Sequence, residues 1–272
     1  MNRKYFITAF ILAILAAAAA GCMSAPPAVK APAAPPAAAQ ESKPAVKHAP
    51  PAGIPVLMYH SIGEEKNNDA VISKDRFAEQ MGYLAKHNYT PISLDDLYAY
   101  LGGSGDLPAK PVLLTFDDGY RDTYEVVFPI LKQYGFKSVL FIPATFAGTR
   151  LSWQELREMK AAWMEIGSHS LTHRDLGDMT PAQQAEEIAK SKEILDSFLS
   201  QNTRYFCYPN SSFNQETLKL LKSHGFRLAF TINPGWVKPG DDPLTLQRVW
   251  MGNNVDLAHF EERLSRSDYS ML

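Results

Sequence analysis

The chain has 272 residues, and its 27 lysines and arginines nearly balance 29 aspartates and glutamates, which leaves a net charge of -2. This balance gives no global electrostatic reason to expect nucleic acid or anionic lipid as a partner. The 2 cysteines are too few for a disulfide framework. The length leaves room for one globular domain beside shorter segments.

The first residues have the pattern of an export signal. Residues 1–4 form a basic start with Arg3 and Lys4, residues 5–20 are mostly apolar, and the letters AAGC that end at Cys22 resemble a lipoprotein cleavage site. We therefore expect a lipoprotein-type signal peptide over 1–21. A lipidated Cys22 would then anchor the exported protein to a membrane, in a periplasm or at a cell surface. The alternative is an ordinary secretory signal with a cysteine near the cut.

Residues 22–53 are rich in alanine and proline and contain little else except lysine. Such a composition cannot bury enough apolar surface to offset the entropy of ordering the chain. We expect a disordered tether here, and a single folded domain over 54–272 that has ample length for one core.

Strands and helices are expected to alternate along this domain. Short apolar runs predict strands, and capping residues followed by apolar residues at helical spacing predict helices. The predicted strands are 54–59, 111–116, 138–142, 165–168, 205–208, 228–232 and 246–251. The predicted helices follow Ser73, include 126–131, span 153–162, and run over 180–199 and 214–225. Repeated strand–helix units indicate parallel strands with helices outside. Candidate site residues follow several separate strand ends, which favours an α/β barrel over an open sheet.

The most informative segment is Thr115-Phe116-Asp117-Asp118-Gly119, at the end of a strand. Two carboxylates a few Å apart raise the pKa of one of them unless a cation intervenes. A divalent metal would divide their roles, with one carboxylate as ligand and the other as base. The alternative is a pair of acidic turn residues, one of which caps the next helix.

A histidine pair follows about fifty residues later, in His169-Ser170-Leu171-Thr172-His173. Two histidines four positions apart can converge on one metal, and one aspartate completes a three-ligand site with open positions. Zinc is the default metal for this set, although cobalt, manganese, iron and nickel also accept it. The combined pattern predicts a metal-dependent hydrolase.

Two further positions follow strand ends. His60 ends the first strand, where it would face the metal across the barrel mouth and donate a proton to a leaving group. A buried histidine that orders the strand end is the alternative, and His259 is a competing acid. The segment Tyr208-Pro209-Asn210 forms a turn that would present a backbone N–H to an oxyanion.

Residues 115–119 and 169–173 together resemble the first two motifs of the polysaccharide deacetylases, which carry the NodB homology domain and form carbohydrate esterase family 4. The resemblance extends over about 54–251. The resemblance is strongest to the extracellular branch, whose members act on poly-N-acetylglucosamine and begin with a strand that ends in Met-Tyr-His. This resemblance implies a distorted (β/α) barrel with fewer than eight repeats.

The resemblance also implies a role for each site residue. Asp117 would be the general base, and Asp118, His169 and His173 the metal ligands. The third motif corresponds to the turn at Asn210, whose backbone N–H would help to hold the oxyanion, although most relatives have an aromatic residue there.

The acid role falls to His60 in the poly-N-acetylglucosamine branch, with His259 as the fallback. The arginine that accompanies the third motif has no counterpart in the sequence next to Cys207.

The function expected from this resemblance is removal of N-acetyl groups from an extracytoplasmic N-acetylglucosamine polymer, with poly-β-1,6-N-acetylglucosamine favoured. Peptidoglycan, chitin oligomers and O-acetyl esters are alternative substrates within the same fold. A non-catalytic glycan-binding module and an aspartyl-phosphate phosphatase are alternatives of other classes. The phosphatase is disfavoured because the two aspartates are adjacent and because that chemistry would leave the histidine pair unused.

Overall fold

The computed structural model describes residues 53–64 and 67–270. The expected signal peptide, Cys22 and almost all of the expected tether therefore lie outside the described residues. In the part of the chain that is described, no helix combines the length and apolar character that crossing a membrane requires.

Seven parallel strands close into a barrel in the order β1, β10, β9, β8, β7, β6, β5 and back to β1. Their bounds are β1 Val56–Tyr59, β5 Pro111–Asp117, β6 Ser138–Ile142, β7 Met164–Ser168, β8 Tyr205–Cys207, β9 Leu228–Pro234 and β10 Leu246–Trp250. The short β4 (Thr90–Pro91) adds to β5 outside this ring, and β2 (Ser61–Ile62) pairs separately with β3 (Val71–Ile72). The predicted α/β barrel with fewer than eight repeats is confirmed.

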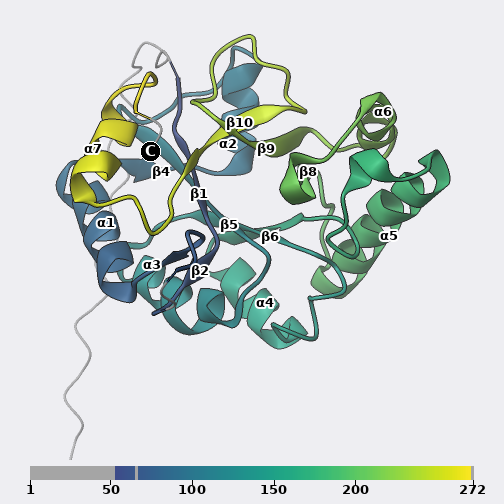
Figure 1. The fold of residues 1–272 in the computed structure, drawn as a ribbon, viewed down its shortest axis with the longest axis horizontal. Helices are drawn as coiled ribbons and strands as arrows, with labels where there is room; N and C mark the ends of the chain where they lie inside the picture. Colours follow the sequence, from purple (N-terminus) through teal and green to yellow (C-terminus); the bar gives the residue numbers. More distant parts are fainter. Residues whose placement is uncertain (1–52, 65–66, 271–272) are drawn as a thin grey trace, which may run out of the picture. The chain divides into compact units, whose positions relative to one another are not determined.

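Helices surround the strands (Figure 1). Their bounds are α1 Lys74–Lys86, α2 Leu94–Leu101, α3 Phe128–Tyr134, α4 Trp153–Ala161, α5 Pro181–Leu199, α6 Gln215–Ser223 and α7 Leu257–Ser265. Shorter helical turns are η1 Thr123–Val127, η2 Leu176–Asp178 and η3 Pro209–Ser211. The side chains of Ser73, Thr180 and Asn214 cap α1, α5 and α6, as their sequence positions predict. The sequence-based expectation did not include α2 and α7.

The barrel is distorted on one side. β7 and β8 pair at one position, Ser168 with Phe206, and the register between β9 and β10 shifts between Leu246 and Arg248. Such irregular pairing lets the strand ends there diverge from an ideal cylinder.

Successive side chains along each strand point alternately into the barrel and outward toward the helices, and both surfaces are buried. Leu113 of β5 belongs to a cluster made largely of side chains from the other barrel strands, whereas Leu114 packs in the cluster that the outer helices cover. By the same period of two, Thr115 and Asp117 share the side of Leu113. A carboxylate therefore enters the interior of the barrel at the carboxyl end of β5.

Candidate active site

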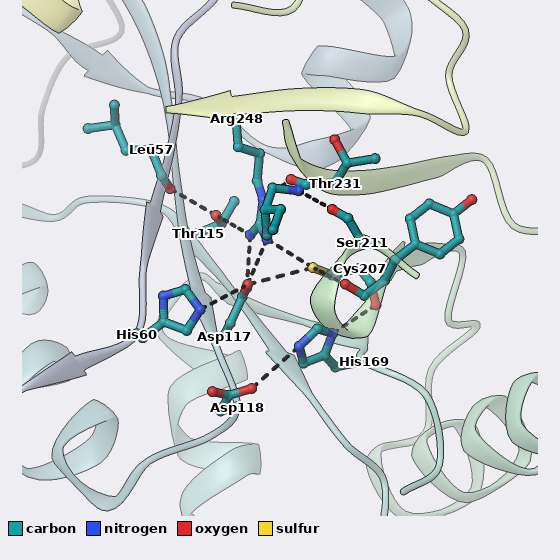
Figure 2. Close-up of polar contacts among 12 residues, drawn as sticks. Leu57, His60, Thr115, Asp117, Asp118, His169, Cys207, Ser211, Thr231 and Arg248 are labelled. Atoms are coloured by element: carbon teal, nitrogen blue, oxygen red, sulfur yellow. Dashed lines mark hydrogen bonds and ion pairs between the residues drawn. The ribbon is translucent and has the colours of Figure 1, made fainter. Parts of the chain in front are cut away.

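The expected site residues lie at the carboxyl ends of four different strands. His60 follows β1, Asp117 ends β5, His169 follows β7, and Asn210 follows β8. Figure 2 shows the side chains of His60, Asp117 and His169 directed toward a common region. In parallel barrels this end of the strands carries the active site, because the loops there converge from every strand.

Asp118, His169 and His173 form a compact cluster of candidate metal ligands. Their ligand atoms lie within 4.8 Å of one another, and Asp118 Oδ1 is 3.4 Å from His169 Nε2 and 3.0 Å from His173 Nε2. Asp118 Oδ1 is buried, yet neither imidazole meets it with hydrogen-bond geometry. An oxygen and two nitrogens that converge without satisfying each other fit a shared cation.

The tautomer of His169 supports the same conclusion. Its Nδ1 lies 2.7 Å from the carbonyl oxygen of Cys207. Because a carbonyl only accepts, Nδ1 must carry the proton, so Nε2 of the neutral ring presents its lone pair to Asp118 and His173. A ligating histidine whose other nitrogen donates to a backbone carbonyl is the usual arrangement at protein metal sites. The donor set therefore fits a divalent metal.

The charges of the cluster also favour a cation. Burial raises the pKa of Asp118, but the two imidazoles outweigh this effect and hold the pKa of that carboxyl well below its ordinary value. Contact with Asp118 raises the pKa of His173. The carboxylate is thus ionised at any pH where a metal could bind.

The backbone that carries these ligands is strained. Asp118, Ser170 and His173 have φ values of 72°, 66° and 62°, in the left-handed region that side chains other than glycine seldom adopt. Each such residue costs about 1 to 3 kcal/mol and persists only where the surroundings enforce it. Gly119 has a φ of 65°, and a Cβ there would lie 2.6 Å from Ile142 Cδ1. The turn after Asp118 therefore requires glycine.

Glu187 of α5 fixes the loop between the two histidines. Its Oε2 accepts hydrogen bonds of 2.9 Å from the backbone N–H groups of both Leu171 and Thr172, and the Thr172 hydroxyl donates to its other oxygen. Glu187 is buried, with 6% of its surface exposed. No local pattern in the sequence indicates this contact, because Glu187 lies in the middle of a helix.

Asp117 is held by a different partner, the fully buried Arg248 of β10. Arg248 Nη1 donates to Asp117 Oδ1 at 2.9 Å, and Nη2 donates to Oδ2 at 2.7 Å (Figure 2). Burial raises the pKa of Asp117, but the guanidinium outweighs this effect, so that pKa lies below its ordinary value. Asp117 thus has a positive partner of its own, separate from the imidazoles that face Asp118, which reduces the repulsion between the two aspartates.

Arg248 itself is positioned on several sides. Its Nε donates to the carbonyl oxygen of Thr231 at 2.9 Å, and Nη1 donates to Thr115 Oγ1 at 3.1 Å. Nη2 also lies 3.1 Å from Cys207 Sγ. The sequence has no arginine beside Cys207, but the structure brings one to that sulfur from β10. Burial raises the pKa of the Cys207 thiol, in keeping with a core cysteine.

His60 is the histidine that lies next to Asp117. Its Nε2 is 3.9 Å from Asp117 Oδ2, and its ring packs at 5.2 Å from the ring of Trp250. Burial lowers the pKa of His60, although the neighbouring carboxylates oppose the change. His259 lies on α7, where its Nδ1 is 2.7 Å from the helix cap Asp256. The geometry thus brings His60, and not His259, to the carboxylate.

Asn210 lies at the edge of the site. It has a φ of 52°, and its side-chain amide donates to Asp175 Oδ1 at 2.8 Å. Together with His173, Asp178 and Gln183 it lines a cavity of about 390 Å³. The asparagine side chain is therefore held in the wall of this cavity by its hydrogen bond to Asp175.

The mouth of this parallel α/β barrel holds a three-ligand cluster, a separately paired carboxylate and a histidine. These features define a candidate metallohydrolase.

Comparison with known proteins specifies the family. The sequence profile of the polysaccharide deacetylases matches residues 104–229. YxkH of Bacillus subtilis, whose name places it among the polysaccharide deacetylases, is 34% identical over 206 residues, which cover 75% of this chain and 73% of YxkH. The chain belongs to the polysaccharide deacetylase family and is an enzyme of the class that deacetylates polysaccharide.

More distant relatives have more specific names. The poly-beta-1,6-N-acetyl-D-glucosamine N-deacetylase of Staphylococcus epidermidis is 24% identical over 71% of this chain and 72% of its own length. The Escherichia coli protein of the same name is 24% identical over 83% of this chain, but the match spans only 40% of the E. coli protein.

Solved structures share the fold. The Streptococcus pyogenes deacetylase PplD, in complex with acetate, superposes with a TM-score of 0.76 at 29% identity, covering 79% of this chain and 100% of PplD. IcaB from Ammonifex degensii gives a TM-score of 0.69 at 29% identity, covering 79% of this chain and 97% of IcaB.

Proposed function

We propose that the chain is a metal-dependent hydrolase that removes N-acetyl groups from an N-acetylglucosamine polymer outside the cytoplasm, with poly-β-1,6-N-acetylglucosamine as the favoured substrate. The observation that carries this proposal is that the adjacent Asp117 and Asp118 have different partners. One carboxylate faces two imidazoles, and the other is paired with Arg248 and lies beside His60.

Asp118, His169 and His173 would hold the metal, with zinc as the default and cobalt, manganese, iron and nickel as alternatives. When bound, a divalent metal supplies Lewis-acid chemistry at this position. The Nδ1–H bond of His169 to the Cys207 carbonyl keeps the ligating nitrogen free.

Asp117 would act as the general base that takes a proton from the attacking water. Arg248 orients this carboxylate from the barrel interior and keeps it ionised. A carboxylate oxygen of Asp117 lies within 4.8 Å of a His169 ring nitrogen, so the proposed base lies beside the candidate metal ligands. The water oxygen becomes part of the released acetate.

His60 would act as the general acid. As the C–N bond breaks, the nitrogen of the sugar takes a proton from His60 Nε2 and leaves as the amine. Burial lowers the pKa of His60, which makes its protonated form a readier donor. The backbone N–H of Asn210, at the edge of the site, is the candidate donor to the oxyanion.

The choice of polymer rests on relatives. Two bacterial proteins named poly-beta-1,6-N-acetyl-D-glucosamine N-deacetylases match more than two thirds of this chain. The expected location, with a signal peptide over 1–21 and a lipidated Cys22, also fits a substrate outside the cytoplasm. Peptidoglycan and chitin oligomers are the alternative substrates.

Acetate release from β-1,6-linked N-acetylglucosamine oligomers tests this proposal. The full chain would be depleted of metal with a chelator and then reloaded with zinc or cobalt. Release that requires added metal supports the proposal. Release from chitin oligomers or peptidoglycan alone would show that the favoured polymer is wrong. Undiminished release after chelation would refute the metal requirement.

A further inference from the structure

A second cavity, of about 440 Å³, lies at the end of the barrel opposite the candidate active site. It is lined by Glu165 near the amino end of β7, Tyr205 at the amino end of β8, and Ser93 before α2. Strands rise about 3.3 Å per residue, so Glu165 and His169 are about 13 Å apart along the chain direction of β7. The two sites therefore belong to opposite faces of the same barrel.

Trp163 is the unusual residue of this cavity. This residue is 62% exposed, and its φ is 70°. It occupies the position just after the cap residue Ala162 of α4, where helices usually place glycine or asparagine because the backbone becomes left-handed. A bulky aromatic residue there costs conformational energy, and burial of the indole does not compensate for it. Single exposed aromatic residues are common, but an exposed one that also strains the backbone favours a role at the surface.

Each cation around the cavity already has at least one partner, although Arg204 Nε is buried without one. Lys160 Nζ donates to the Leu199 carbonyl at 2.7 Å, Arg204 lies 3.3 Å from Asp95, and Lys137 lies 3.5 Å from Asp96. A phosphate or a polyanion would have to displace these contacts. The charge balance therefore fits a neutral ligand that is rich in hydroxyl groups.

Polar groups that suit such a ligand surround the indole. Glu165 Oε1 accepts from the backbone N–H of Leu94 at 2.9 Å, and the Glu165 side chain also lines the cavity. Gln201 and Asn202 contribute amides to the same wall. Gln201 Nε2 and Asn202 Oδ1 already have partners within the protein, so Gln201 Oε1 and Asn202 Nδ2 are the amide atoms available to a ligand. An aromatic face flanked by a few placed polar groups, in a cavity of several hundred Å³, is the usual composition of a small-molecule subsite.

We propose that this cavity is a second carbohydrate-binding site, in which the indole of Trp163 stacks on an N-acetylglucosamine unit while Glu165, Gln201 and Asn202 bond its hydroxyls. The sugar identity rests on the proposed function, whereas the site itself rests on Trp163 and the cavity. A polymer that engages this site while another segment occupies the opposite face is held at high effective concentration. A short oligomer that reaches only one face gains nothing from it.

Binding of the full chain to N-acetylglucosamine hexamers, β-1,6-linked and β-1,4-linked, tests this proposal. Titrations are made in chelator, so that turnover does not interfere, and compare the wild type with Trp163→Gly, which suits the left-handed position. The matched control is Tyr134→Ala, which removes the side chain of an aromatic residue on α3 that is 39% exposed and does not line the cavity. Thermal unfolding of each variant reports on the fold.

The proposal predicts that Trp163→Gly weakens binding of at least one hexamer by about tenfold or more, while its thermal stability equals or exceeds that of the wild type. Tyr134→Ala should bind as the wild type does. Equal binding of both hexamers by wild type and Trp163→Gly would overturn the proposal, and so would the absence of hexamer binding by the wild type.

A parallel assay of acetate release from trimers separates this proposal from the catalytic one. Trp163→Gly should release acetate from trimers at the wild-type rate, because only the remote site has changed. Trp163-dependent binding without acetate release would refute the catalytic proposal and leave this one standing.

Discussion

Arg248 and Asp117 form a two-point ion pair across the barrel interior, although 131 residues separate them in the sequence. Both side chains are almost completely buried, with relative exposures of 0% and 2%. The pair explains how two adjacent aspartates remain ionised at one turn. Arg248 neutralises Asp117 from inside the barrel, and His169 and His173 face Asp118 at the mouth.

Arg248→Met should destabilise the metal-free protein by about 3 to 5 kcal/mol, because it leaves the Asp117 carboxylate buried without its partner. Urea unfolding followed by circular dichroism measures this change. The double variant Arg248→Met with Asp117→Asn should recover part of the loss, because no ionised group then lacks a partner. Equal instability of the single and double variants would contradict this account of the pair.

Glu187→Ala should weaken metal binding by roughly tenfold to a hundredfold without removing a ligand. The reason is that the backbone N–H groups of Leu171 and Thr172 lose the carboxylate that fixes the loop before His173. Competition with a chromogenic chelator measures the affinity. Glu186→Ala is the matched control, because Glu186 is on the same helix but pairs with Lys190 at the surface. If both variants bind metal as the wild type does, Glu187 has no positioning role.

His60→Ala should reduce the turnover number by roughly two to four decades, the usual contribution of a general acid, while the bound metal is retained. His259→Ala should leave turnover unchanged, because that histidine is engaged with the cap of α7. Metal analysis and acetate release on both variants give the two readouts. A large loss in His259→Ala together with an active His60→Ala would move the acid role to α7.

Glu165→Gln should change the pH dependence of stability. Burial raises the pKa of Glu165 from 4.5 to about 7 in the folded protein. The folded state therefore binds the proton more tightly than the unfolded state, so this residue reduces stability as pH rises from about 4.5 to about 7. Glutamine keeps the acceptor for Leu94 N–H and does not ionise.

The variant should consequently gain about 3 kcal/mol over the wild type at pH 8 and little at pH 4. Urea unfolding at the two pH values measures the difference. A gain of equal size at both pH values would show that ionisation of Glu165 is not its cause.

The fold class could be predicted from the sequence. The proximity of the two motifs, Asp117-Asp118 and His169 to His173, could also be predicted, because each motif is contiguous and follows an apolar strand. The sequence could not reveal Arg248 or Glu187. Arg248 reaches Asp117 only after seven strands close into a barrel, and neither its neighbours nor its spacing indicates a site. Glu187 has the sequence environment of an ordinary helical glutamate.

Two helices were also missed for local reasons. α2 is only 8 residues long, so its helical periodicity is brief. α7 is only 9 residues long and includes Glu261, Glu262 and Arg263, so few apolar residues mark its buried face. Ser93 and Asp96 form a capping box at the start of α2, and that pattern was the available signal.

The division of roles between the two aspartates is tested most directly by measuring metal content and acetate release on the same preparations of Asp117→Asn and Asp118→Asn. The account predicts that Asp117→Asn retains stoichiometric metal and loses roughly two to four decades of rate, as expected for removal of a general base. Asp118→Asn should lose metal and activity together. Loss of metal from Asp117→Asn, or full metal in Asp118→Asn, would contradict the account.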